Sequence, residues 1–142
     1  MRRIRAILAG LALAMAGVPA GAMPVVAVDP GFAPVASVLV RLFQDRTGQG
    51  VTLLVGDPAV LAGLGADVLL ASDAALPARL AETGQAAADS LVTYATDPGA
   101  QAPRDAVLLA QAAQDPVARA FLAFLLTPEA WDIIVAHGFG AH

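Results

Sequence analysis

Four aspartates each follow an apolar stretch that is typical of a β-strand. They are Asp29, Asp57, Asp73 and Asp97. If the strands run parallel, their carboxyl ends share one edge of the sheet and the four carboxylates gather around one crevice. Carboxylate oxygens suit Ca²⁺ or Mg²⁺, so the pattern raises the hypothesis of a divalent-cation site. The alternative is that each Asp caps a helix or closes a turn, because Asp is common at both and three of these four precede a proline.

Few other side chains have a spacing that points to chemistry. Tyr94 could offer a hydroxyl to a ligand, or could pack as an aromatic residue on a strand. His137 and His142 have no carboxylate or hydroxyl partner near them in the sequence, and Ser72 lacks a Gly-x-Ser-x-Gly setting. No phosphate-binding glycine loop, zinc-type histidine spacing or paired catalytic carboxylate motif is present. The sequence therefore predicts a protein that is not an enzyme and carries no cofactor.

The first residues have the layout of a secretory signal peptide. Three arginines within the first five residues precede an apolar run that ends near residue 17, and small residues follow at 20–22. The run is too short to span a membrane. We therefore expect residues 1–22 to direct export to the periplasm and residues 23–142 to form one domain. An uncleaved anchor or a short buried helix is the alternative for the first segment.

The charge of the chain limits its partners. It has eight Lys or Arg, twelve Asp or Glu and a net charge of −4. Three arginines precede residue 23, so the balance of the remainder is 5 − 12 = −7. Such a chain has little to neutralise phosphates, so nucleic acids and anionic membranes are not expected partners. The absence of cysteine excludes thiol chemistry and a Cys-bound metal.

The periodicity of apolar residues alternates between strand and helix along the chain. Apolar runs predict strands at 24–28, 51–55, 66–73 and 90–96, and a run at 106–110 favours a fifth strand over the start of a helix. Helical periodicity predicts helices at 34–47, 59–64 and 76–83, and residues 99–105 have no clear structure. Asp115 and Thr127, each followed by proline, predict the N-caps of two further helices, the second ending at 138. This alternation predicts one α/β lobe of three layers, with a mostly parallel sheet of four or five strands and helices on both faces.

Three segments carry a resemblance to a known family. They are ADVLLASD at 66–73, YATD at 94–97 and DPVARAFLAFLLTPEAWDIIVAHGF at 115–139, and FQDRTG at 43–48 fits as well. In these segments the chain resembles the periplasmic molybdate- and tungstate-binding proteins of ABC transporters, which have a type II periplasmic-binding fold. The resemblance implies a binding protein that delivers a tetrahedral oxyanion to a permease, with ATP hydrolysed by partner subunits. It also implies two lobes that hold the oxyanion through neutral hydroxyls and through backbone N–H groups at helix N-termini.

The chain departs from that family at the positions that would hold the ligand. Most of a second lobe is missing between residue 83 and the YATD segment, so we expect a one-lobed protein. The first hydroxyl ligand falls on Gly31, and the second falls in the turn that contains Asp57 and Pro58. Tyr94 alone matches a ligand position of the family. Proline lacks an N–H, and the carboxylates of Asp29 and Asp57 would repel an oxyanion.

Two classes of function follow from these observations. The first is a reduced solute-binding component of an ABC importer, in which a second copy of the chain could supply the missing wall as a homodimer. The second is a periplasmic interaction module or remnant that keeps the fold and binds no small ligand, with a divalent cation at the strand-end aspartates as a variant. An enzyme is a third class for which the sequence names no reaction.

Overall fold

The computed structural model describes residues 23–99 and 101–140. The predicted signal peptide, residues 1–22, lies outside the described residues. Within the described ranges, no helix is both long enough and apolar enough to cross a membrane.

The described residues form a single α/β domain around a mixed sheet. Its strands are β2 (Val25–Val28), β3 (Thr52–Val55), β4 (Val68–Leu70), β5 (Val92–Asp97) and β6 (Ala102–Leu108). They lie in the order β3-β2-β4-β6-β5. Strand β2 pairs in parallel with β3 and β4, whereas β6 runs antiparallel to both β4 and β5. Four strands therefore point the same way and β6 opposes them, which confirms the predicted mostly parallel sheet of four or five strands.

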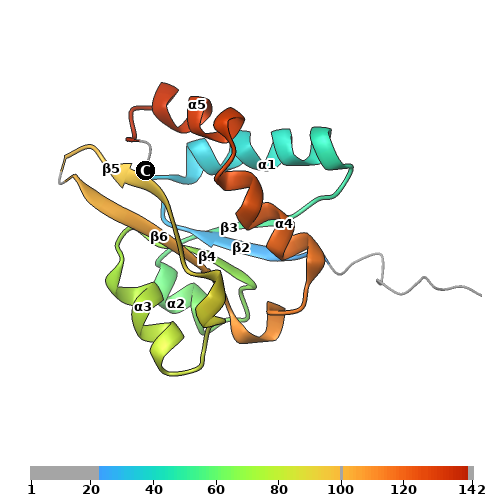
Figure 1. Cartoon of the computed structure of the whole chain (residues 1–142), viewed down its shortest axis with the longest axis vertical. Helices are drawn as coiled ribbons and strands as arrows, with labels where there is room; N and C mark the ends of the chain where they lie inside the picture. Colours follow the sequence, from blue (N-terminus) through green and yellow to red (C-terminus); the bar gives the residue numbers. More distant parts are fainter. Residues whose placement is uncertain (1–22, 100, 141–142) are drawn as a thin grey trace, which may run out of the picture.

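Helices cover both faces of the sheet, as the alternating pattern predicts. The helices are α1 (Ala33–Thr47), α2 (Pro58–Ala62), α3 (Ala75–Glu82), α4 (Pro116–Leu125) and α5 (Pro128–Ala136), with short 3₁₀ turns η1 (Ala88–Ser90) and η2 (Ala110–Ala112). Helices α1, α4 and α5 lie on one face, and α2 and α3 lie on the other (Figure 1). The predicted three-layer lobe is confirmed.

The two central parallel strands divide their side chains between the two faces. In β4, Val68 and Leu70 join the larger hydrophobic cluster under α1, α4 and α5, and Leu69 joins the smaller cluster over α2 and α3. All three are fully buried. Successive residues of a strand point to opposite faces, so a strand with helices on both sides needs an unbroken apolar run. This explains why β4 reads as VLL without a polar residue.

The C-terminal helix pair begins where the sequence predicts. The side chain of Asp115 accepts hydrogen bonds from the backbone N–H groups of Val117 and Ala118 at the start of α4. The side chain of Thr127 accepts one from Ala130 N at the start of α5. These caps occupy N–H groups that have no partner inside a helix. The starts of both helices are therefore fixed by local sequence.

The segment before the last strand is the main departure from the predicted elements. Residues 99–105 have no strand signal, yet β6 begins at Ala102 and pairs with β5 as a hairpin. Its first half contains Pro103, Arg104 and Asp105, which interrupt the apolar pattern. At its other end the strand stops at Leu108, so the expected strand at 106–110 is confirmed but ends two residues early.

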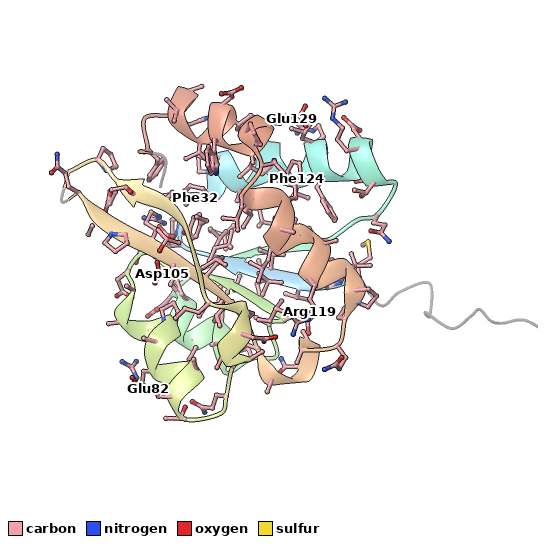
Figure 2. The ribbon with its side chains drawn as sticks, viewed as in Figure 1. Phe32, Glu82, Asp105, Arg119, Phe124 and Glu129 are labelled. Carbon is pink, nitrogen blue, oxygen red and sulfur yellow. The ribbon has the colours of Figure 1, made fainter. Side chains whose placement is uncertain are left out.

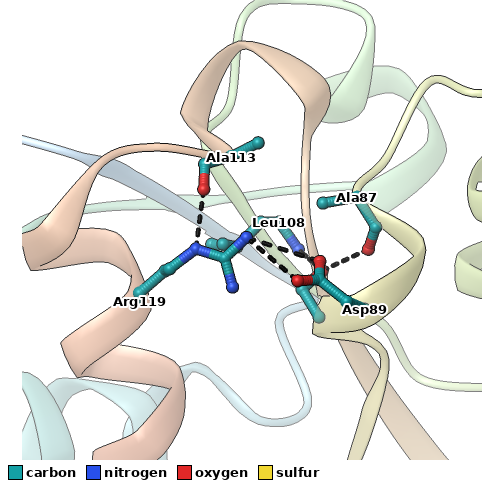
Figure 3. Close-up of polar contacts among 6 residues, drawn as sticks. Ala87, Asp89, Leu108, Ala113 and Arg119 are labelled. Atoms are coloured by element: carbon teal, nitrogen blue, oxygen red, sulfur yellow. Dashed lines mark hydrogen bonds and ion pairs between the residues drawn. The ribbon is translucent and has the colours of Figure 1, made fainter.

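A polar contact closes the gap between η1 and the last strand. Ser90 is buried, and its hydroxyl donates to Ala87 O at 2.6 Å while accepting from Leu108 N at 2.9 Å. Nearby, Arg119 of α4 pairs with Asp89 at 3.4 Å (Figure 3). Strand β5 begins only at Val92, so the hydroxyl of Ser90 supplies the acceptor that a longer strand would have given to Leu108 N.

Candidate functional site at the strand-end edge

The carboxyl ends of β2, β3, β4 and β5 lie at one edge of the sheet, which we call the strand-end edge. This follows from the pairing directions, and it places Asp29, Asp57, Asp73 and Asp97 at the same edge, as predicted. The side chains do not converge, however. Among the described residues, no group of three or more His, Asp or Glu side chains could hold a metal ion. The hypothesis of a shared cation site therefore gains no support from the arrangement of these four residues.

Two of the aspartates are engaged at the starts of helices. Asp57 is the N-cap of α2, and its Oδ1 accepts a hydrogen bond from Ala59 N at 3.0 Å. Asp73 Oδ1 accepts from Leu76 N at 3.1 Å in the first turn of α3. Both carboxylates lie in regions of positive potential made by backbone N–H groups. The capping role that the sequence left as the alternative is the one seen here.

Asp97 ends β5 and helps to close the hairpin to β6. Its main-chain oxygen accepts a hydrogen bond from Gln101 N at 2.7 Å. The preceding residue, Thr96, exchanges backbone hydrogen bonds with Gly140 near the C-terminus. At this position the backbone, rather than the carboxylate, makes the contacts that shape the edge.

Asp29 forms an ion pair with a buried arginine. Its Oδ1 accepts from the guanidinium Nη2 of Arg104, which lies on β6, two strands away in the sheet. The side chain of Arg104 is only 4% exposed, whereas that of Asp29 is 16% exposed. A charge that leaves water needs a charged partner and hydrogen bonds. Asp29 supplies the charge and accepts one hydrogen bond, and the Tyr94 hydroxyl accepts another.

Tyr94 is fully buried beneath this ion pair, and its hydroxyl is occupied on both sides. It donates to Ala71 O at 2.7 Å and accepts from Arg104 Nε at 3.1 Å. Burial raises the pKa of the Tyr94 hydroxyl, and the nearby charge of Arg104 opposes that rise. The hydroxyl stays neutral and links β5, β6 and the end of β4.

Three aromatic rings surround the guanidinium of Arg104. Its central carbon lies 5.1 Å from the ring centre of Phe32, 5.9 Å from that of Tyr94 and 5.3 Å from that of Phe139. Phe32 meets the other two rings edge-to-face, with both centroid separations at 5.0 Å. It lies between the sheet and the layer of α1, α4 and α5 (Figure 2). Ring faces attract a cation, so this cage stabilises the buried charge.

A pocket of about 210 Å³ opens at the same edge, beside the starts of α2 and α3. It is lined by Asp57, Pro58, Ala59, Ala71, Ser72, Asp73, Ala75, Leu76 and Arg79. Two predicted ligand positions, Asp57 and Pro58, line it together with Asp73. Gly31 and Tyr94 do not. A Cβ atom at Gly31 would lie 3.1 Å from Asp29 Oδ2, so that turn packs against the Asp29 carboxylate instead.

Arg104 is the residue of this edge that sequence reasoning missed. It stands in a segment read as a loop, because Pro103 and Asp105 flank it. Ala106, Val107 and Leu108 are all buried, so this strand shows no alternation of apolar and polar residues that would have marked Arg104 as facing the interior.

The comparisons with known proteins bear on the fold of this edge. No protein-family model and no curated protein matches the sequence. Among solved structures, the periplasmic molybdate-binding protein of Azotobacter vinelandii is similar, with a TM-score of 0.73. The match covers 84% of this chain and 99% of that chain at 14% sequence identity. At that identity the likeness establishes a periplasmic-binding-protein-like fold.

Proposed function

We propose that this chain is an extracytoplasmic solute-binding protein that holds a small oxyanion at the strand-end edge. The observation that carries the proposal is the pocket beside the starts of α2 and α3, whose lining includes Ser72 and Arg79. The similar solved structure is named as a molybdate-binding protein, which supports molybdate as the first ligand to test. Open α/β sheets bind ligands at this edge because loops and helix starts meet there.

The charges that line the pocket predict weak binding. Arg79 attracts an anion, whereas Asp57 and Asp73 repel it. Two like charges about 4 Å apart cost on the order of 1 kcal/mol in bulk water, and more where water is partly excluded. The hydrogen bonds of both carboxylates to helix N–H groups offset part of this repulsion, because they draw the negative charge toward the helices.

Thermal melting with added anions tests the proposal. Molybdate, tungstate and sulfate are each titrated into the purified protein, and at least one should raise the melting temperature. A ligand at 100 times its dissociation constant adds about 2.7 kcal/mol of stability. Arg79→Ala should abolish the increase, and Arg41→Ala, which removes an exposed arginine of α1, should leave it unchanged. If none of the three anions shifts the melting temperature of the unaltered protein, the proposal fails.

The proposal also assigns partners and a location. An ABC permease in the membrane would receive the solute from this protein in the periplasm. A second copy of the chain would supply the wall that a single lobe lacks. Light scattering with and without molybdate checks the last point, because a monomeric mass in both conditions rules out a ligand-bridging homodimer.

A second candidate is an interaction module that binds no small ligand. The observation that favours it is the closed network of Asp29, Arg104 and Tyr94, in which the Tyr94 hydroxyl is already engaged by protein groups. This candidate predicts no change in melting temperature with any of the three anions. Calorimetric titration with Ca²⁺, Mg²⁺ and Mn²⁺ tests its variant with a divalent cation at the strand-end aspartates, and no heat at millimolar metal would exclude that variant.

A further inference from the structure

The strand-end edge contains a buried cation, Arg104, that does not line the pocket. Among residues 23–99 and 101–140, Arg104 is the only charged residue that is buried. Its guanidinium is enclosed by the rings of Phe32, Tyr94 and Phe139 and donates through Nε to the Tyr94 hydroxyl. A buried guanidinium needs a negative counter-charge and hydrogen-bond acceptors, so this position requires an anion beside Arg104.

The anion now in that position belongs to the chain itself. Asp29 pairs with Arg104 from the solvent side, because its side chain is the more exposed of the two. The other nearby carboxylate, Asp105, accepts a hydrogen bond from the Thr93 hydroxyl at 2.6 Å and so has a separate partner. The Asp29 carboxylate therefore occupies the position that a bound carboxylate ligand of Arg104 would take, and it is covalently attached to the end of β2.

We propose that Asp29 is a built-in anion that closes an anion site formed by Arg104, and that a free carboxylate or oxyanion occupies this site once the Asp29 side chain is absent. The proposal rests on the proposed function only for the class of ligand, since the site lies apart from the pocket that contains Arg79. In the unaltered chain, Asp29 competes with any external anion at this position. Asp29 thereby keeps external anions out of the Arg104 site.

The turn that contains Asp29 is held by its backbone, which makes the side chain replaceable. The main-chain oxygen of Asp29 accepts from Phe32 N at 3.2 Å and from Ala33 N at 3.1 Å. The variant Asp29→Ala keeps these bonds and removes only the carboxyl group. Formate has the size and charge of the group removed, so it is the matched probe for the vacated space.

The experiment follows the melting temperature of Asp29→Ala during titration with sodium formate. Formate should bind this variant at least tenfold more tightly than the unaltered protein. At ten times the dissociation constant it should raise the melting temperature by about 5 °C. Asp45→Ala, which removes an exposed carboxylate of α1 that does not line the pocket, is the control for ionic strength and net charge and should show no such increase. The double variant Asp29→Ala, Arg104→Met should also lose the response.

Two outcomes would overturn the proposal. One is a folded Asp29→Ala variant that formate does not stabilise beyond the Asp45→Ala control. The other is an equal response in the double variant, which would place the anion elsewhere. If Asp29→Ala does not fold in buffer, its yield on refolding in formate is compared with that in an equal concentration of sodium chloride. A higher yield in formate supports the proposal, and equal yields contradict it.

The outcome is separable from that of the proposed function. Molybdate binding by the unaltered protein that depends on Arg79 tests the pocket, and formate binding by Asp29→Ala that depends on Arg104 tests the closed site. Titrating molybdate and sulfate into Asp29→Ala then shows whether the opened site also admits a tetrahedral anion. Binding that needs Arg104 would extend the site to oxyanions, and its absence alongside a formate response would restrict the site to carboxylates.

Discussion

Replacing Tyr94 by Phe removes one oxygen atom and tests whether the buried network holds the sheet together. The ring stays, so its contacts with Phe32 and with Arg104 are kept. What is lost is the donor to Ala71 O and the acceptor for Arg104 Nε. Water has little access to restore either bond, because Tyr94 is 0% exposed and Ala71 is 2% exposed.

The cost follows from the two groups that lose their partners. A buried polar group left without a hydrogen bond costs about 1–3 kcal/mol, with charged groups at the upper end. The two bonds share one oxygen and are not independent, so we expect about 3 kcal/mol in total. A domain of this size has a free energy of unfolding of about 5–15 kcal/mol, so the loss is a large share of it. The melting temperature should fall by about 10 °C.

Urea unfolding followed by circular dichroism and by Trp131 fluorescence measures this loss. The midpoint should fall while the slope stays constant, because the surface exposed on unfolding is nearly unchanged. Thr83→Val is the control, since its hydroxyl bonds to main-chain oxygens of α3 at an exposed site and should change stability by less than about 0.5 kcal/mol. A loss for Tyr94→Phe as small as that of the control would refute the network as a stabilising element.

Three further predictions concern the contacts that fix the helices and the last strand. Ser90→Ala should destabilise the fold by about 1–3 kcal/mol and speed hydrogen exchange at Leu108 N, because that buried donor loses its acceptor; unchanged exchange by NMR would contradict this. Asp115→Ala should cost about 1 kcal/mol in urea unfolding through loss of the α4 N-cap, and an unshifted midpoint would count against the cap. The hydrogen bond from Arg46 lowers the pKa of Glu129, so its contribution to stability is present above the unfolded-state pKa and disappears as pH falls through the folded-state pKa. Glu129→Gln should therefore make the free energy of unfolding less dependent on pH on the acid side. An unchanged dependence on pH, measured by urea unfolding, would show that this ion pair contributes nothing.

The elements that were predicted from sequence are those whose signals are local. The N-caps at Asp115 and Thr127 lie within three residues of the N–H groups that they satisfy. The unbroken apolar run of β4 reflects helices on both faces of the sheet. In each case the physical cause lies in a few adjacent residues, so the sequence displays it directly.

The candidate site was predicted less completely because its contacts are distant in sequence. The common edge of the four aspartates follows from parallel pairing and was expected. The partners of these side chains were not expected. Asp29, for example, pairs with Arg104, which lies 75 residues later in the chain. The sequence left open whether Tyr94 offers its hydroxyl to a ligand or packs as an aromatic residue on a strand, and its contacts with Ala71 and Arg104 depend on where β4 and β6 lie. Whether Tyr94 also contacts a ligand stays a prediction.

The sequence by itself determined the α/β class, the alternation of strands and helices and the edge at which acidic residues gather. These follow from hydrophobic periodicity and turn chemistry, which act over a few residues. Only the tertiary structure decided that β6 enters the sheet antiparallel between β4 and β5, and that entry carries Arg104 into the interior. A buried charge must find its counter-charge wherever the fold places one, and here the fold placed Asp29 beside it.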